Sequence, residues 1–193
     1  NGVMILMVKI KNILSLFDGM SGGQLALKRA GIPFENYYAS EIKPHAIAVT
    51  QHNFPDTIQV GDVTKLTKAD LPKIDLLIGG SPCQDLTILV QSREGLEGSK
   101  SILFFEYVRL LKELKPKYFL LENVASMRNA DRDLITKILG VEPILINSYL
   151  VSAQHRRRYY WTNIPGVTQP EDLNILLDDV VDRTAAPEEN MSE

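Results

Sequence analysis

Short apolar runs alternate with stretches of helical periodicity along most of the chain. Apolar runs bounded by glycine, proline or charged residues predict five strands, at residues 11–17, 37–40, 57–60, 74–78 and 118–121. Apolar spacings of three and four predict helices around residues 26–30, 46–53, 103–114 and 131–139, with a short polar helix at 68–71. This alternation predicts a doubly wound α/β fold with a mostly parallel sheet.

Two further strand-like runs follow, at residues 143–150 and 158–163. Only residues 151–157 separate them, and so short a link predicts an antiparallel hairpin at the C-terminal end of the sheet.

Polar groups or glycines follow five of the predicted strands, where a doubly wound sheet binds its ligands. They are Asp18-Gly19, Glu41, Asp62, Ser81-Pro82-Cys83 and Glu122. A glycine turn lets backbone approach a ligand closely, and an acidic residue about twenty positions later is placed to accept hydrogen bonds from ribose hydroxyls. Asp62 is placed to accept from an adenine amino group, with Val63 packing on the base. The spacing lacks the G-x-G-x-x-G pattern of dinucleotide sites, which favours methyl transfer.

Cys83 is the single cysteine of the chain and follows a strand and a glycine pair. Taken alone, this position fits a nucleophile or a small buried apolar residue equally well. A lone cysteine excludes an intrachain disulfide and fits a reducing compartment.

The composition is that of one soluble globular domain, with 193 residues, 45% apolar and 23% charged. A net charge of −3 argues against wholesale electrostatic binding to nucleic acid, so such binding requires a local patch, and residues 155–158 form the densest basic run. The three histidines lack metal-ligand spacing, so no metal is expected. The apolar run at residues 3–8 is too short to span a bilayer, so no membrane association is expected.

As a set, these residues resemble the DNA (cytosine-5) methyltransferases over roughly residues 13–165. The matching stretches stand in the family's order at residues 17–22 (FDGMSG), 81–84 (SPCQ), 122–124 (ENV) and 154–158 (Q-x-R-x-R), and Glu41 and Asp62 fall at the ribose and adenine positions. The amino-acid sequence of these stretches is similar to that of the animal de novo branch, and to that of related bacterial and phage enzymes. The resemblance implies a Rossmann-like methyltransferase fold that depends on S-adenosylmethionine.

The resemblance also assigns roles to residues of this chain. The implied cofactor-binding residues are Phe17, Asp18, Gly19, Met20, Ser21, Gly22, Glu41, Ile42, Asp62, Val63, Gly80 and Pro82. The implied catalytic residues are Cys83, Glu122, Asn123, Arg156 and Arg158, and Gln84 and Arg157 are expected to contact DNA.

The implied reaction is methylation of cytosine carbon 5 through a covalent cysteine adduct on a base flipped out of the duplex. The polar stretch at residues 85–100 is the expected lid, with Gly95 and Gly98 as hinges. We divide the chain into a flexible N-terminal extension, a catalytic domain, and a linker with an acidic tail, at residues 1–10, 11–165 and 166–193.

Nothing between residues 166 and 193 resembles the target-recognition region or the last motifs of the family. We therefore expect a second polypeptide or a second copy to supply the missing part. Two alternatives stay open: a truncated, non-catalytic relative that serves as a partner module or remnant, and an enzyme that methylates cytosine in RNA. The expected location is the cytoplasm of a bacterial or phage-infected cell, or the nucleus of a eukaryotic one.

Overall fold

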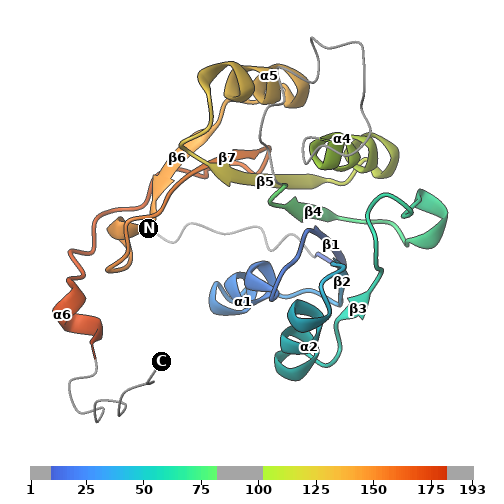
Figure 1. The fold of residues 1–193 in the computed structure, drawn as a ribbon, viewed down its shortest axis with the longest axis horizontal. Helices are drawn as coiled ribbons and strands as arrows, with labels where there is room; N and C mark the ends of the chain where they lie inside the picture. The colour runs from blue at the N-terminus through green and yellow to red at the C-terminus, as the bar shows by residue number, and fades with distance from the viewer. Residues whose placement is uncertain (1–9, 82–101, 182–193) are drawn as a thin grey trace, which may run out of the picture.

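The computed structural model describes residues 10–81 and 102–181 and contains one seven-stranded sheet (Figure 1). The strands are β1 (Asn12–Leu16), β2 (Asn36–Ser40), β3 (Ile58–Gln59), β4 (Leu76–Gly79), β5 (Tyr118–Val124), β6 (Ile144–Asn147) and β7 (Arg157–Thr162). The α-helices are α1 (Gly22–Arg29), α2 (Pro44–Asn53), α4 (Ile102–Leu114), α5 (Asn129–Leu139) and α6 (Leu177–Val180), and the 3-10 helices are η1 (Lys68–Asp70) and η2 (Ser148–Leu150).

The strand order is β3-β2-β1-β4-β5-β7-β6, with the first five strands parallel. The expected hairpin is confirmed, because β6 and β7 pair antiparallel. Strand β7 also pairs antiparallel with β5 and therefore lies between β5 and β6. The predicted doubly wound, mostly parallel α/β fold is confirmed.

The sheet is buried on both faces, as parallel sheets in α/β proteins are. Alternate residues of β1 point to opposite faces, so Leu14 and Leu16 join a core beneath α4 and α5, whereas Ile13 joins a second core with Leu27 of α1. Figure 1 shows α4 and α5 together on one side of the sheet and α1 on the other. Trp161 of β7 is fully buried, and its indole N–H donates to the Thr136 hydroxyl of α5 at 3.0 Å.

Several elements differ from the sequence-based expectation, and β5 runs on to Val124, so Glu122 lies within the strand and not after it. Strand β4 begins at Leu76, two residues later than predicted, and the carboxylate of the preceding Asp75 accepts the N–H groups of Lys11 and Asn12. Strand β6 ends at Asn147, whose side chain accepts the N–H of Tyr149 and so starts η2. The short helix α6 lies within the stretch that we expected to be linker and tail.

In the described ranges, we find no helix long and apolar enough to cross a membrane.

Candidate active site

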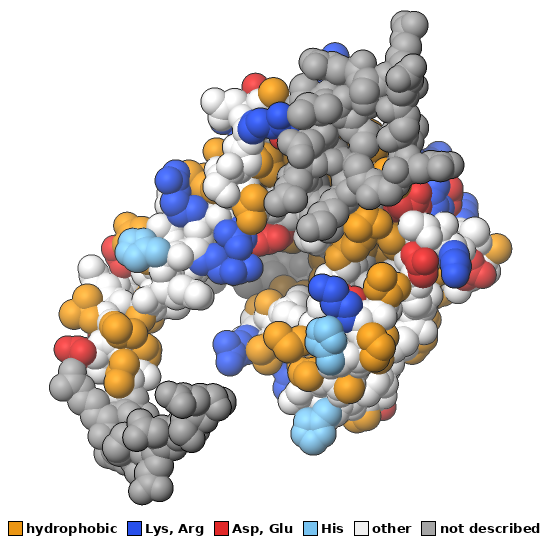
Figure 2. Space-filling model, in the orientation of Figure 1, with side chains coloured by type: hydrophobic (Ala, Val, Ile, Leu, Met, Phe, Trp, Pro, Cys, Tyr) orange, Lys and Arg blue, Asp and Glu red, His pale blue; other side chains and the backbone are white. Residues whose placement is uncertain are grey.

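A cavity of about 560 Å³ opens at the carboxyl ends of β1, β2, β4 and β5 and reaches the start of β7. Its size falls within the range typical of small-molecule sites. Figure 2 shows basic side chains beside an acidic one at the edge of a hollow in the middle of this face. The residues that line the cavity are Phe17, Gly19, Ser40, Glu41, Ile42, Lys43, Asp62, Val63, Gly80, Ser81, Leu103, Glu122, Asn123, Val124, Arg156 and Arg158.

The turn after β1 is built from left-handed backbone. Phe17, Gly19 and Ser21 have φ angles of 57°, 61° and 58°, a region that costs energy for the two residues that are not glycine. The carboxylate of Asp18 accepts the hydroxyl of Ser21 at 2.5 Å and that of Tyr37 at 2.8 Å. Burial, and then the Asp18 charge, raise the pKa of Tyr37, so its hydroxyl stays a donor. Asp18 and Ser21 thus hold the turn from within.

Glu41 is the most heavily hydrogen-bonded carboxylate of the cavity. Its Oε1 accepts the N–H groups of Ile42 and Lys43, both at 2.9 Å, and its Oε2 accepts the N–H of Gly19 at 2.8 Å. Burial raises the pKa of Glu41, but the three N–H donors outweigh it and leave the pKa below its usual value. A carboxylate offers about four acceptor positions, so one position on Oε2 is left for a ligand hydroxyl.

Asp62 faces the same cavity from the turn after β3. Its Oδ1 accepts both the N–H and the hydroxyl of Thr64, at 2.9 and 2.8 Å. The N–H and then the hydroxyl of Thr64 lower the pKa of Asp62. Oδ2 accepts no hydrogen bond from the described residues and is available to a ligand donor. The neighbouring Val63 is buried in the core beneath α4 and forms part of the cavity wall.

Glu122 and Arg158 form an ion pair across the antiparallel β5 and β7 strands. The Arg158 Nε lies 2.7 Å from the Glu122 Oε1, although this Nε has no aligned hydrogen bond in the described part of the chain. A Cβ at Gly80 would stand 3.0 Å from the Glu122 Oε2, so glycine leaves space for the carboxylate. Tyr160 lies opposite Glu122 in the strand register. Burial, and then the Glu122 charge, raise the pKa of Tyr160.

Asn123 is buried beside this pair and fixes the end of β4. Its side-chain amide donates to the Ser81 carbonyl at 2.9 Å, and its amide oxygen accepts the N–H of Val124 at 2.7 Å. Ser81 is the last described residue before the stretch that carries Cys83. Asn123 therefore holds the backbone of Ser81, two residues before Cys83 in the chain.

The three arginines of the basic run differ in whether they line the cavity. Arg156, directly before β7, and Arg158 line the cavity, whereas Arg157 lies outside the lining, and both Arg156 and Arg157 are exposed. The backbone N–H of Arg156 donates to the Asn147 side chain at 3.0 Å, which fixes the start of β7 beside β6.

The structure brings together most of the residues that the sequence predicted. The predicted cofactor residues in the cavity lining are Phe17, Gly19, Glu41, Ile42, Asp62, Val63 and Gly80, and the predicted catalytic residues there are Glu122, Asn123, Arg156 and Arg158. Four predicted cofactor residues lie outside the lining: Asp18, Met20, Ser21 and Gly22. Met20 is 65% exposed. Pro82, Cys83, Gln84 and the expected lid at residues 85–100 lie outside the described residues.

Five lining residues were given no specific role from the sequence: Ser40, Lys43, Ser81, Leu103 and Val124. Four of them, all but Leu103, lie within two positions of predicted residues at the carboxyl ends of strands, and that proximity could have indicated them. Leu103 is the second residue of α4 and is far along the chain from the other lining residues. In the ranges 10–81 and 102–181, no group of three or more His, Cys, Asp or Glu side chains is arranged to hold a metal ion.

The strand order and the cavity at the carboxyl ends define a class, the Rossmann-like methyltransferases. Two crystal structures share this fold. A candidate DNA modification methyltransferase from an Escherichia coli prophage is 30% identical, with a TM-score of 0.62 over 78% of this chain and 45% of its own. A mutant of Spodoptera frugiperda DNMT2 is 25% identical, with a TM-score of 0.65 over 86% of this chain and 54% of its own.

The sequence profile of the family described as C-5 cytosine-specific DNA methylase matches residues 11–164. The chain therefore belongs to the C-5 cytosine-specific DNA methylase family. The orphan methyltransferase M.SPRI of Bacillus phage SPR is 35% identical over 77% of this chain and 36% of its own length. The type II methyltransferase M.NgoBV of Neisseria gonorrhoeae is 36% identical over 77% of this chain and 40% of its own. The chain thus spans less than half the length of these relatives.

Proposed function

We propose that this chain transfers a methyl group from S-adenosylmethionine to carbon 5 of a cytosine in DNA, through a covalent adduct with Cys83. One observation carries the proposal. The acceptors suited to adenosine, Glu41 and Asp62, and the ion pair of Glu122 with Arg158 line one continuous cavity. A cofactor and a cytosine base can therefore meet in this cavity, which is also lined by Ser81, two residues before Cys83.

The residues present fit S-adenosylmethionine. Glu41 keeps one acceptor position for a ribose hydroxyl, and Asp62 keeps Oδ2 for the amino group of adenine. Phe17 and Val63 supply apolar wall, and Gly19 and Gly80 allow close approach of backbone. When bound, the cofactor supplies an electrophilic methyl group. Asp18, Met20, Ser21 and Gly22 stay predicted cofactor residues, with Asp18 and Ser21 acting by holding the turn.

Carbon 5 of cytosine is a weak nucleophile, so the reaction requires activation of the ring. In our proposal the Cys83 thiolate forms a bond to carbon 6, which pushes an electron pair towards ring nitrogen 3. In its protonated form Glu122 donates a hydrogen bond to that nitrogen and stabilises the developing negative charge, and Arg158 holds the Glu122 side chain in place. Carbon 5 would then form a bond to the methyl group as the bond between that methyl group and the sulfonium sulfur breaks, which leaves S-adenosylhomocysteine. A base removes the proton from carbon 5, the electron pair restores the double bond between carbons 5 and 6, and the carbon–sulfur bond breaks to release the Cys83 thiolate.

The arginines at the start of β7 would orient the base and its strand. Arg156 lines the cavity and carries a planar fork of donors that suits the base carbonyl or a flanking phosphate. Arg157 is exposed beside the cavity and is our candidate for a phosphate contact, with Gln84 as a second DNA-contacting residue. The base must leave the duplex to reach the cavity, because none of these groups can enter a stacked helix.

Tritiated methyl transfer tests the proposal. The chain is incubated with labelled cofactor and with duplex DNA or tRNA, and Cys83→Ala serves as the matched inactive control. We expect label in DNA, none in tRNA, and none with Cys83→Ala. Label in tRNA alone would favour an RNA methyltransferase. Cofactor binding without transfer to either substrate would favour the non-catalytic partner module.

Three narrower expectations belong to the same proposal. We propose the cytoplasm of a bacterial or phage-infected cell as the location, supported by the Bacillus phage and Neisseria relatives. The similarity in sequence to the animal de novo branch stays a prediction. So does a target-recognition region supplied by a second polypeptide or a second copy. Sedimentation of the chain with and without duplex DNA checks the last of these.

A further inference from the structure

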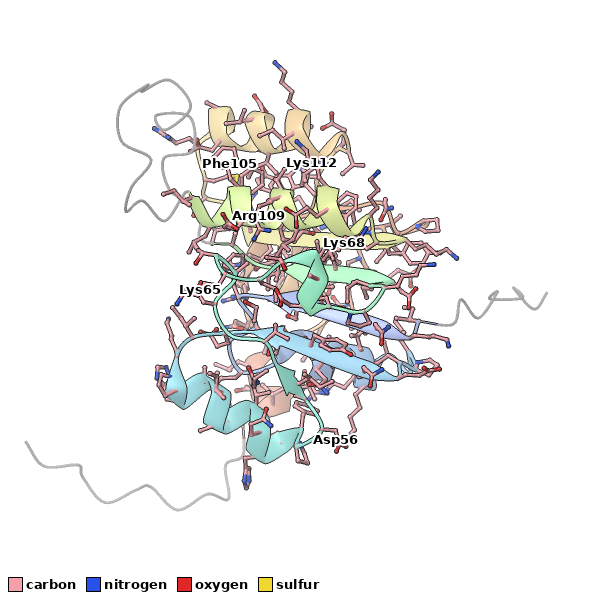
Figure 3. All side chains as sticks on the ribbon, turned by 90° about the vertical axis from the view of Figure 1, so that its right-hand side faces the viewer. Asp56, Lys65, Lys68, Phe105, Arg109 and Lys112 are labelled. Carbon is pink, nitrogen blue, oxygen red and sulfur yellow. The ribbon has the colours of Figure 1, made fainter. Side chains whose placement is uncertain are left out.

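Arg109 of α4 joins the helix to the turn that carries Asp62. Its Nη2 donates to the backbone carbonyls of Val63 and Leu66, at 3.1 and 2.9 Å. Figure 3 shows Arg109 on α4 beside the segment between β3 and β4, where Lys65 and Lys68 lie.

The remaining donors of Arg109 are held by its own helix. Its Nε donates to Glu106 at 2.8 Å, and its Nη1 donates to both carboxylate oxygens of Glu113 at 3.2 Å. Nη2 also lies 2.7 Å from the Glu106 Oε2, so all three guanidinium nitrogens have acceptors. The two carboxylates fix the orientation of the fork, and the fork in turn fixes two carbonyls. Lysine has the same charge but cannot reproduce this planar arrangement.

The turn that Arg109 holds is short. The N–H of Lys65 donates to the Asp62 carbonyl at 3.1 Å, and the N–H of Leu66 donates to the Val63 carbonyl at 3.3 Å. The Val63 carbonyl therefore receives a second donor from Arg109 on the far side of the turn. Val63 and Leu66 are both buried beneath α4. Asp62 precedes this anchored pair directly and presents its carboxylate to the cavity.

We infer that Arg109 is a positioning residue for recognition of the adenine ring, because it fixes the turn that aims Asp62 into the cofactor cavity. The inference rests on the proposed function, since it takes the cavity to bind an adenosine-containing cofactor. Arg109 touches no ligand in this account. It sets how well Asp62 distinguishes an amino group at position 6 of the purine from an oxygen there.

The test compares two ligands that differ at that position, S-adenosylhomocysteine and S-inosylhomocysteine, by calorimetric titration. We expect the wild-type chain to bind the adenosine ligand at least tenfold more tightly. Arg109→Lys and Arg109→Gln should reduce this preference to less than threefold. The double variant Glu106→Gln, Glu113→Gln keeps one oxygen acceptor for the fork at each position, so the carbonyl contacts and most of the preference should remain.

Arg132→Met is the matched control, because Arg132 of α5 pairs with Asp133 on the surface and contacts no cavity turn in the described residues. A general loss of stability would weaken both ligands equally and leave their ratio unchanged. An unchanged ratio in a folded Arg109→Lys or Arg109→Gln variant would therefore overturn the inference. Failure of the wild-type chain to bind either ligand would instead overturn the proposed function.

Discussion

The two halves of the cavity are built differently. On the side of β1 and β2, the acidic groups are pinned by several fixed donors: Glu41 by three backbone N–H groups, and Asp18 by two hydroxyls. On the side of β5 and β7, Glu122 has one charged partner, Arg158, and accepts no backbone N–H from the described residues.

The difference fits the two tasks. The adenosine of the cofactor stays uncharged throughout methyl transfer, so a rigid set of donors and acceptors suits it. The cytosine ring gains and loses charge during the reaction. A carboxyl group with one charged partner, Arg158, suits that change because fewer fixed hydrogen bonds hold it. Substitutions in the first half should therefore change cofactor affinity and the free energy of unfolding, whereas substitutions in the second half should change the rate of methyl transfer.

The largest expected effect comes from the second half. Glu122→Gln keeps the shape of the side chain but removes the charge that pairs with Arg158. We expect methyl transfer to fall about 10²- to 10³-fold, the usual range for loss of one group that stabilises charge in a transition state. Single-turnover transfer measures the rate, and calorimetry should find cofactor affinity within twofold of wild type. A tenfold loss of affinity with a normal rate would reverse the assignment of the two halves.

Gly80→Ala should act through the same carboxylate. The added Cβ would stand 3.0 Å from the Glu122 Oε2 and push it by a few tenths of an ångström. Because a misplacement of about 1 Å can cost about 10²-fold in rate, we expect a fall of about tenfold. The control is a double-mutant cycle with Glu122→Gln. The two effects should fail to add, since both remove the same interaction. Additive effects would mean that Gly80 matters for another reason.

Tyr37→Phe tests the first half. It removes the hydroxyl that donates to the Asp18 carboxylate, which leaves a partly buried acceptor with one fewer donor. We expect the free energy of unfolding to fall by about 1–3 kcal/mol, and cofactor affinity to weaken with it as the turn loosens. Urea unfolding measures the first effect. Tyr38→Phe is the matched control, because the Tyr38 hydroxyl makes no hydrogen bond in the described part of the chain, and it should shift the free energy of unfolding by less than about 0.5 kcal/mol.

The smallest expected effect is a pH dependence from Glu41. Its pKa in the folded protein lies below the usual value, so its contribution to stability is complete above the unfolded pKa of about 4.3. That contribution is lost as the pH falls through the lower folded value. Thermal unfolding between pH 8 and pH 3 should show this loss at the acid end, and Glu41→Gln should reduce it. An equal acid loss in Glu41→Gln would exclude Glu41 as its source.

Much of this comparison could be read from sequence. The positions of Glu41, Asp62 and Glu122 were predictable, because each closely follows a short apolar run that marks a buried strand, although β5 continues through Glu122 to Val124. The alternation of Arg156, Arg157 and Arg158 was predicted from the Q-x-R-x-R stretch that resembles the family.

The rest depends on tertiary pairing. A short link between β6 and β7 predicts a hairpin, but it does not say that β7 inserts beside β5 and so brings Arg158 to Glu122. Nor does any local pattern bring Tyr37 to Asp18, or Arg109 to the turn after β3. These contacts join segments that are far apart in sequence, and their partners are chosen by packing of the whole sheet.

Covalent trapping is the most direct test of the central claim, that this cavity methylates cytosine through a cysteine adduct. Duplex DNA that contains 5-fluorocytosine is incubated with the chain and S-adenosylmethionine, and the products are separated under denaturing conditions. Fluorine at carbon 5 cannot leave as a proton would, so the adduct should persist. The account predicts a stable complex that needs both the cofactor and Cys83, with Cys83→Ala still binding the cofactor. A complex formed equally by Cys83→Ala would contradict it.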